Sequence, residues 1–231
     1  AKGAVPMGIL ANGWQWGFMG AQPIAGDYDG DGVSDPGVYN PFDGRWYIRS
    51  LSGDVLHFGT QCGNKGAQPI RGDYDGNGVM DLTVYDPQTG MWYMKFNFPA
   101  TPASKRPALE ALAQRWGFPG SIAVPGDYNG DGMADLAVYS RFDGRWYILS
   151  LGGAPLDRNG GFPSLQVLAF MRQWGYAGAV PVPGDFNGDG KSDLAVYDPG
   201  TGKWYVQSLD GSVLLFGQNW GGFKGAELIL P

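Results

Sequence analysis

The stretch GDYDGDGVSDPGVYNPFDGRWYIRSL, from Gly26 to Leu51, decides the fold because its pattern returns three more times along the chain. Each copy opens with an acidic, glycine-rich loop. The loops begin at Asp27, Asp73, Asp127 and Asp185, which gives spacings of 46, 54 and 58 residues. Self-similarity at a period of about 20 to 50 residues is typical of stacked, equivalent structural units. We therefore interpret the chain as four units plus edges.

Each unit contains four short apolar or aromatic runs, which predict four β-strands. The first run precedes the acidic loop, as in AQPIAG at 21–26, and the second follows it, as in DLAVY at 135–139. A tight turn ending in Gly, such as FDG at 42–44, leads to the third run and is typical of a hairpin. The fourth run is DVLHFG at 54–59 or its equivalent. This arrangement predicts an all-β fold, a β-propeller of four-stranded antiparallel blades.

We expect residues 1–231 to form a single propeller domain with four blades. Five blades stay an alternative, because MGILANGWQWG at 7–17 resembles a fourth strand and GAELIL at 225–230 resembles a first strand. The segment PALEALAQ at 107–114 has helix-forming composition, which leaves a helical insertion open there. The expected repeat units cover about 22–60, 68–117, 122–175 and 180–231, with 1–20 as a closing N-terminal segment.

The bulk composition narrows the classes of function. With 43% hydrophobic and 14% aromatic residues, the chain has the material for a packed core despite its 40 glycines. The net charge of −6 and the absence of a basic run disfavour nucleic-acid binding. No segment approaches the roughly 18 apolar residues of a membrane span, and no secretion signal is visible in residues 1–13.

The acidic loops carry a pattern of oxygen ligands. Numbered from its first aspartate, each loop has only Asp or Asn at positions 1, 3, 5 and 9, and Gly at position 6. The glycine allows the sharp turn that points the position 7 carbonyl inward, so the side chain at position 7 is free to vary. The candidate ligands are Asp27, Asp29, Asp31, Val33 and Asp35; Asp73, Asp75, Asn77, Val79 and Asp81; Asp127, Asn129, Asp131, Met133 and Asp135; and Asp185, Asn187, Asp189, Lys191 and Asp193.

Ligands that are all oxygen suit a hard cation, and Ca²⁺ fits better than Mg²⁺, which demands strict octahedral geometry. The loops hold 13 of the 22 acidic residues, so we expect about four Ca²⁺ ions. An EF-hand is excluded, because position 12 is Val instead of Glu and the flanks are strands. A metal-free turn rich in Asp, Asn and Gly is the alternative interpretation.

The residues DYDGDGVSD at 27–35, followed by GVY and RWYI, resemble the FG-GAP (VCBS-like) repeat. This repeat occurs in integrin α-subunit propellers and in many secreted bacterial and fungal proteins. The resemblance implies that the ion lies in the loop between the first and second strands of a blade, held by the residues given above. It also implies a location outside the cell or at the cell surface. The chain departs from the best-known members in having about four units instead of seven.

Catalysis is not expected. The chain has one histidine, His57, and two glutamates, Glu110 and Glu227, and no serine stands in a nucleophile motif. Cys62 occupies the place where the other units have Trp, which favours a packing role. We therefore expect a protein that is not an enzyme.

Two sets of tryptophans recur with the repeat. Trp46, Trp92, Trp146 and Trp204 lie on third strands, where packing between blades explains them. The second set follows the fourth strand in WG corners and could form wedges between blades or sites that stack on sugar rings: Trp16, Trp116, Trp174 and Trp220.

These observations leave two functions open. The first is a calcium-stabilised propeller that serves adhesion or protein interaction. The alternative is a lectin, or the accessory sugar-binding domain of a polysaccharide-degrading enzyme, since some proteins with this repeat are lectins. The partner is then a protein or a glycan.

Overall fold

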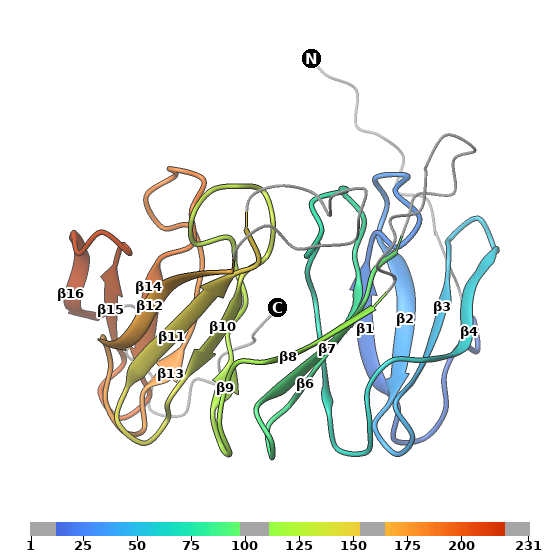
Figure 1. The fold of residues 1–231 in the computed structure, drawn as a ribbon, viewed down its shortest axis with the longest axis horizontal. Helices are drawn as coiled ribbons and strands as arrows, with labels where there is room; N and C mark the ends of the chain where they lie inside the picture. The colour runs from blue at the N-terminus through green and yellow to red at the C-terminus, as the bar shows by residue number, and fades with distance from the viewer. Residues whose placement is uncertain (1–12, 98–110, 153–164, 220–231) are drawn as a thin grey trace.

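The computed structural model describes residues 13–97, 111–152 and 165–219. Within these ranges the chain forms sixteen β-strands and no helix, and the strands make four sheets of four antiparallel strands each. In every sheet the strands lie in the order of the sequence, so each sheet is a simple meander. The four sheets follow one another through the molecule from blue to red (Figure 1). They are the blades of a β-propeller, which confirms the predicted fold class.

The blades are numbered here in chain order. Blade 1 contains β1 (Gln22–Gly26), β2 (Asp35–Asn40), β3 (Arg45–Arg49) and β4 (Val55–Gln61). Blade 2 contains β5 (Gln68–Ile70), β6 (Leu82–Asp86), β7 (Met91–Lys95) and β8 (Ala111–Arg115). Blade 3 contains β9 (Ile122–Ala123), β10 (Leu136–Tyr139), β11 (Arg145–Ser150) and β12 (Gln166–Gln173). Blade 4 contains β13 (Val180–Pro181), β14 (Leu194–Asp198), β15 (Lys203–Gln207) and β16 (Val213–Asn219).

The Gly-ended turns connect the second and third strands of each blade, as the sequence predicts. In blade 1, Asn40 pairs with Arg45, and the N–H of Gly44 donates to the carbonyl of Asn40 at 2.9 Å. Gly44 has a φ of +78°, and a Cβ there would lie 2.5 Å from the carbonyl oxygen of Gly63. Both the left-handed backbone and the close approach of a second chain segment therefore require glycine at this position.

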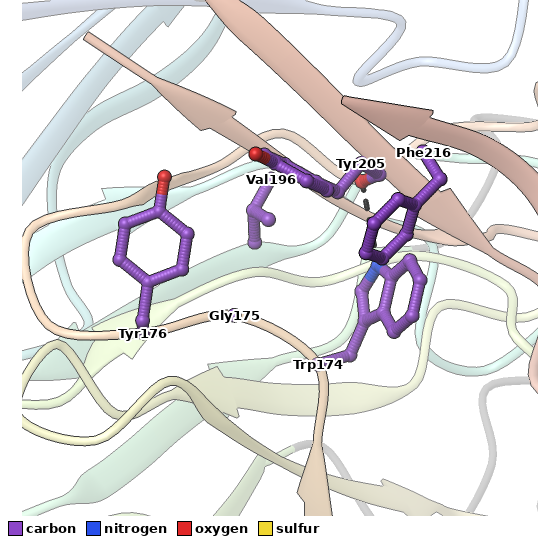
Figure 2. Close-up of a pocket in the computed structure, with 6 residues that line it drawn as sticks. All are labelled: Trp174, Gly175, Tyr176, Val196, Tyr205 and Phe216. Atoms are coloured by element: carbon purple, nitrogen blue, oxygen red, sulfur yellow. Dashed lines mark hydrogen bonds between the residues drawn. The ribbon is translucent and has the colours of Figure 1, made fainter. Parts of the chain in front are cut away.

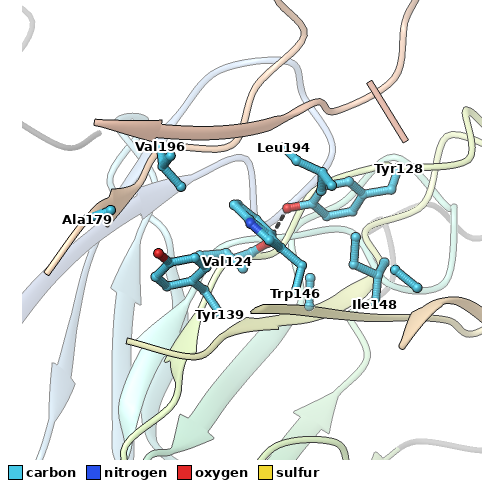
Figure 3. Close-up of a cluster of buried hydrophobic side chains, with 10 residues drawn as sticks. Val124, Tyr128, Tyr139, Trp146, Ile148, Ala179, Leu194 and Val196 are labelled. Atoms are coloured by element: carbon cyan, nitrogen blue, oxygen red, sulfur yellow. Dashed lines mark hydrogen bonds between the residues drawn. The ribbon is translucent and has the colours of Figure 1, made fainter. Parts of the chain in front are cut away.

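The core lies between successive blades. One face of each blade presents large aromatic residues to the opposite face of the next, and Trp46, Trp92 and Trp146 are fully buried. Figure 3 shows the cluster between blades 3 and 4, where Trp146 from β11 packs beside Leu194 from β14. The prediction that third-strand tryptophans pack between blades is confirmed for these three. Trp204 is only half-buried, because no described residue of a further blade covers it.

Backbone hydrogen bonds also join each acidic loop to the next one. The N–H of Met80 donates to the carbonyl of Asp27 at 2.7 Å, and the same link repeats from blade 2 to blade 3 and from blade 3 to blade 4. The two later links join Ala134 to Asp73 at 2.7 Å and Ser192 to Asp127 at 2.6 Å. The four loops therefore lie side by side at one end of the blades.

The helical alternative for residues 107–114 is wrong for its described part. Residues Ala111–Arg115 form strand β8, which pairs in register with β7 and alternates exposed and half-buried side chains. Pairing with β7 thus overrides the local helix propensity. Residues 107–110 lie outside the described part of the chain, as do 225–230 and most of 7–17, on which the five-blade alternative depends.

Candidate functional sites

Position 1 of each acidic loop organises the turn that follows it. In the first loop, Asp27 Oδ1 accepts from the N–H of Gly30 at 2.6 Å and Asp27 Oδ2 accepts from the N–H of Gly32 at 2.7 Å. The equivalent pairs of bonds form in the other three loops, at 2.6 to 2.9 Å. Both oxygens of the carboxylate are used, which explains why this position is always Asp and never Asn.

Position 9 joins the end of each loop to its beginning. Asp35 Oδ2 accepts from the N–H of Tyr28 at 2.8 Å, and position 9 of every other loop repeats this bond at 2.7 to 2.9 Å. All four of these aspartates are buried at the start of the second strand of their blade. The buried aspartate at position 9 therefore fixes where the second strand of each blade begins.

Positions 5 and 7 are linked within the loop. Asp31 Oδ1 accepts from the N–H of Val33 at 2.7 Å, and the equivalent bond forms in the other loops at 2.7 to 2.9 Å. The position 7 side chains range from buried Val79 and Met133 to exposed Val33 and Lys191. This range is expected where only the backbone of position 7 has a fixed role.

Positions 1, 3 and 9 converge in the first two loops. Carboxylate oxygens of Asp27, Asp29 and Asp35 lie within 4.8 Å of one another, and so do those of their counterparts Asp73, Asp75 and Asp81. Asp31 is not part of the first group. In the third and fourth loops position 3 is an amide, and its side-chain nitrogen donates to the position 5 carboxylate, at 2.8 Å from Asn129 and 3.1 Å from Asn187.

Two buried carboxylate oxygens in these loops have no hydrogen-bond partner. They are Asp35 Oδ1 and Asp135 Oδ1, and both residues are only 1% exposed. Burial raises the pKa of each residue to about 6; the backbone N–H bond opposes this shift, as does the nearby Ser150 hydroxyl at Asp135, and neighbouring carboxylates add to it. A buried acceptor without a donor is costly, and a cation bound by the converging carboxylates would satisfy it. The residues present therefore fit a hard divalent ion.

The second loop differs in a way that the sequence analysis missed. Asn97 donates its backbone N–H to Asp81 Oδ1 at 2.9 Å, so this oxygen has the partner that Asp35 Oδ1 and Asp135 Oδ1 lack. The Asn97 side chain also donates to the carbonyl of Met80 at 2.7 Å, and the backbone carbonyl of Asn97 accepts from Asn77 Nδ2 at 2.6 Å. Burial and neighbouring carboxylates raise the pKa of Asp75 to about 7. The only signal in the sequence is that Asn97 stands where the other units have Leu.

The WG corners form a second repeated feature. Trp16, Trp116 and Trp174 each donate their indole N–H to the backbone carbonyl of a third-strand tyrosine, at 3.2 to 3.3 Å. Each indole is half-buried beside a phenylalanine of the fourth strand, with ring centroids 6.4 Å apart. Figure 2 shows the copy in blade 4, with Trp174, Tyr205 and Phe216 around one cavity. The fourth predicted residue, Trp220, lies outside the described residues.

The ring most open to solvent in these corners is not the predicted tryptophan. Phe58, Phe170 and Phe216 are 75%, 65% and 72% exposed, and each packs edge-on against the third-strand tyrosine at 5.3 to 5.4 Å. The sequence analysis missed these residues because it treated the fourth strand only as a structural element. The signal available was the Phe that recurs in the fourth-strand runs HFG, AFM and LFG.

Blade 2 has no aromatic corner. Cys62 replaces the tryptophan, and Ala113 faces Tyr93 where the other blades have phenylalanine. Cys62 is buried, its Sγ donates to the carbonyl of Leu82 at 3.0 Å, and burial raises its pKa to about 12. These contacts agree with the predicted packing role.

Four meanders, each with an acidic loop between its first and second strands, define a repeat protein of the β-propeller class. The family model described as an FG-GAP-like repeat matches residues 127–196, which run from the third acidic loop through blade 3 to the second strand of blade 4. The predicted resemblance is thereby confirmed over that range. No curated protein matches the chain. In the residues that the structure describes, no helix has the length and apolar character needed to cross a membrane.

Proposed function

We propose that this chain is a calcium-binding β-propeller module in which each of the four acidic loops holds one Ca²⁺. The observation that carries the proposal is the convergence of three carboxylates in each of the first two loops, together with the unpartnered buried oxygens of Asp35 and Asp135. The FG-GAP-like repeat at residues 127–196 supports the same function. The oxygen-only ligand set favours Ca²⁺ over softer metals.

When bound, the ion supplies positive charge that neutralises the converging carboxylates. The chain's own residues fix the shape of the loop. Asp27 and its counterparts hold the turn through their bonds to Gly30 and Gly32 N–H groups or the equivalents. Asp35 and its counterparts tie the loop to the start of the second strand. Calcium binding therefore stabilises the connection between the first two strands of a blade, and the loop-to-loop backbone bonds extend that effect to the next blade.

The test is a calorimetric titration of Ca²⁺ into protein stripped with a chelator, followed by thermal melts with and without the ion. We expect about four sites. Each site should contribute about 2.7 kcal/mol of stability at a free calcium concentration of about 100 times its Kd. A titration without heat, combined with a melting temperature that calcium does not shift, would contradict the proposal.

The module has a recognition role in this proposal, in adhesion or protein interaction outside the cell or at its surface, and not a catalytic one. Two observations support the non-catalytic part of this assignment. His57 is partly buried, its Nδ1 lies 3.1 Å from the Thr60 hydroxyl, and burial lowers its pKa. Cys62 is buried with a raised pKa, so neither residue is poised for catalysis. The role is tested by retention of beads coated with the chain on protein-coated and glycan-coated surfaces, in calcium and in chelator. Retention on neither surface would contradict it.

A further inference from the structure

The three aromatic corners of blades 1, 3 and 4 share one geometry. In each, the tyrosine of the third strand lies at 87 to 89° to an exposed phenylalanine of the fourth strand, and the half-buried tryptophan lies beside the same phenylalanine at 55 to 58°. The corner in blade 3 encloses about 240 Å³ and the corner in blade 4 about 310 Å³. These volumes suit one small ring and lie at or below the lower end of drug-sized pockets.

The exposed phenylalanine is held outward by an irregularity in the sheet. In blade 1, Trp46 pairs with Thr60 and Tyr47 pairs with Phe58, so Gly59 is an extra residue. The same shift occurs in blade 4 at Gly217 and in blade 3 near Met171. Met171 is the only non-glycine residue with positive φ in the described chain, at 56°. A bulge that persists even without glycine is typical of a strand that re-aims a side chain next to a site.

Polar and cationic groups lie at the rim of the same corners. A Cβ placed on Gly59 would lie 3.6 Å from Arg45 Nη1 and 3.8 Å from the Tyr47 hydroxyl oxygen. In blade 4 the equivalent position on Gly217 lies 3.8 Å from the Tyr205 hydroxyl oxygen and 3.9 Å from Lys203 Cδ. The corners of blades 1 and 4 thus combine apolar ring faces with a hydroxyl and a basic side chain.

Blade 2 keeps only the third-strand tyrosine, Tyr93, of this arrangement. Its strands β7 and β8 pair without a register shift, Ala113 stands opposite Tyr93, and Cys62 replaces the tryptophan. Met91 takes the place of the basic residue at the start of the third strand. The tryptophan, the phenylalanine, the bulge and the basic side chain are therefore present together in three blades and absent together from one, which indicates that they form one functional unit.

From these observations we propose that the corners at Phe58, Phe170 and Phe216 are three equivalent binding sites for pyranose rings of an oligosaccharide. A pyranose has an apolar C–H face that stacks on an aromatic ring and hydroxyl groups that bond to Tyr, Arg and Lys. An extended peptide fits less well, because it would add to the outer strand, and the bulge interrupts that edge. Three sites on one scaffold bind a repetitive glycan with avidity. This proposal rests on the recognition role proposed above.

The experiment uses the calcium-loaded chain and titrates it with hexasaccharides of glucose, N-acetylglucosamine, mannose and galacturonic acid, followed by calorimetry and tryptophan fluorescence. We expect at least one of them to bind. Replacing one exposed phenylalanine by alanine should weaken binding up to about tenfold, and F58A/F170A/F216A together should abolish it. If only the galacturonic acid oligomer binds, the basic rim residues contact the carboxylate of the sugar. If a neutral oligomer binds, they contact its hydroxyl groups.

The matched control is F42A/F142A, which removes two phenylalanines that are 64% and 59% exposed in the turns between the second and third strands. This variant should bind as the parent does. Absence of binding by all four hexasaccharides, or equal binding by the triple variant, would overturn the proposal. A calcium-dependent melting temperature separates this failure from failure of the calcium proposal, because the melt does not depend on any sugar.

Discussion

Blade 2 and the other three blades differ in two places at once. Blade 2 has the most buried acidic loop, in which Asp75 and Asp81 are 4% and 0% exposed and Asn97 partners the position 9 carboxylate. It also lacks the aromatic corner, whereas blades 1, 3 and 4 keep an aromatic corner. Blades 1 and 3 have, in addition, a position 9 oxygen without a partner. The comparison teaches that one repeat combines two separable parts, a loop that organises the connection between the first two strands and an aromatic corner that differs between blades.

The largest expected effect concerns the position 9 aspartates. In calcium-free protein, Asp81→Ala should leave the N–H groups of Tyr74 and Asn97 without an acceptor, at about 1 to 3 kcal/mol each. Asp35→Ala leaves only the N–H group of Tyr28 without an acceptor, so it should cost about half as much. Urea unfolding of the two variants measures the difference. Equal losses would show that Asn97 does not distinguish the two loops.

A smaller effect is expected from restoring the tryptophan of blade 2. Cys62→Trp should destabilise the protein by no more than about 1 kcal/mol, because Cys62 borders a cavity of about 460 Å³ that Tyr93 and Ala113 also line, which leaves room for a larger side chain. Cys62→Ser tests the alternative that the thiol itself matters. Thermal melts compare the two, and a larger loss would show that blade 2 has no room for an aromatic corner.

The stability of the calcium-free protein should depend on pH through the buried carboxylates of Asp35 and Asp135. The pKa of Asp35 and of Asp135 is about 6 in the folded state and lower when unfolded, so the folded state binds more protons between about pH 4 and 6. These two residues should therefore make the folded state less stable as the pH rises through that window, and calcium should remove the effect. Urea unfolding at several pH values checks it. A D35N/D135N variant should show a flatter profile.

The smallest expected effect is at the bulge of blade 3. Met171 has the left-handed φ that Gly59 and Gly217 adopt in blades 1 and 4. Met171→Gly should therefore stabilise the chain by up to about 1 kcal/mol. Thermal melts measure the gain. Destabilisation instead would show that Met171 contributes contacts that outweigh its backbone strain.

The repeat, the strands and the acidic loops could be predicted from the sequence, because their residues are determined by local rules. Gly44 marks a turn, and the apolar and aromatic runs around Val38 and Trp46 mark strands, and the same residue types mark the same elements in the other blades. Asn97 could not be predicted, since it lies outside the loop that it completes and meets Asp81 only after β6 and β7 fold back. The outward Phe170 was equally hidden, because the bulge beside it carries Met171 where a glycine would have signalled it.

The links between neighbouring acidic loops use main-chain atoms only, from Asp27 to Met80, from Asp73 to Ala134 and from Asp127 to Ser192. Such a connection makes no demand on the side chains at either end. A gene segment that encodes one more unit could therefore be duplicated and joined to its neighbour at once, before any substitution adapts the new copy. The main-chain links between the acidic loops would therefore form in a duplicated unit without any change of sequence. The aromatic corner of the added copy could then change without affecting these links.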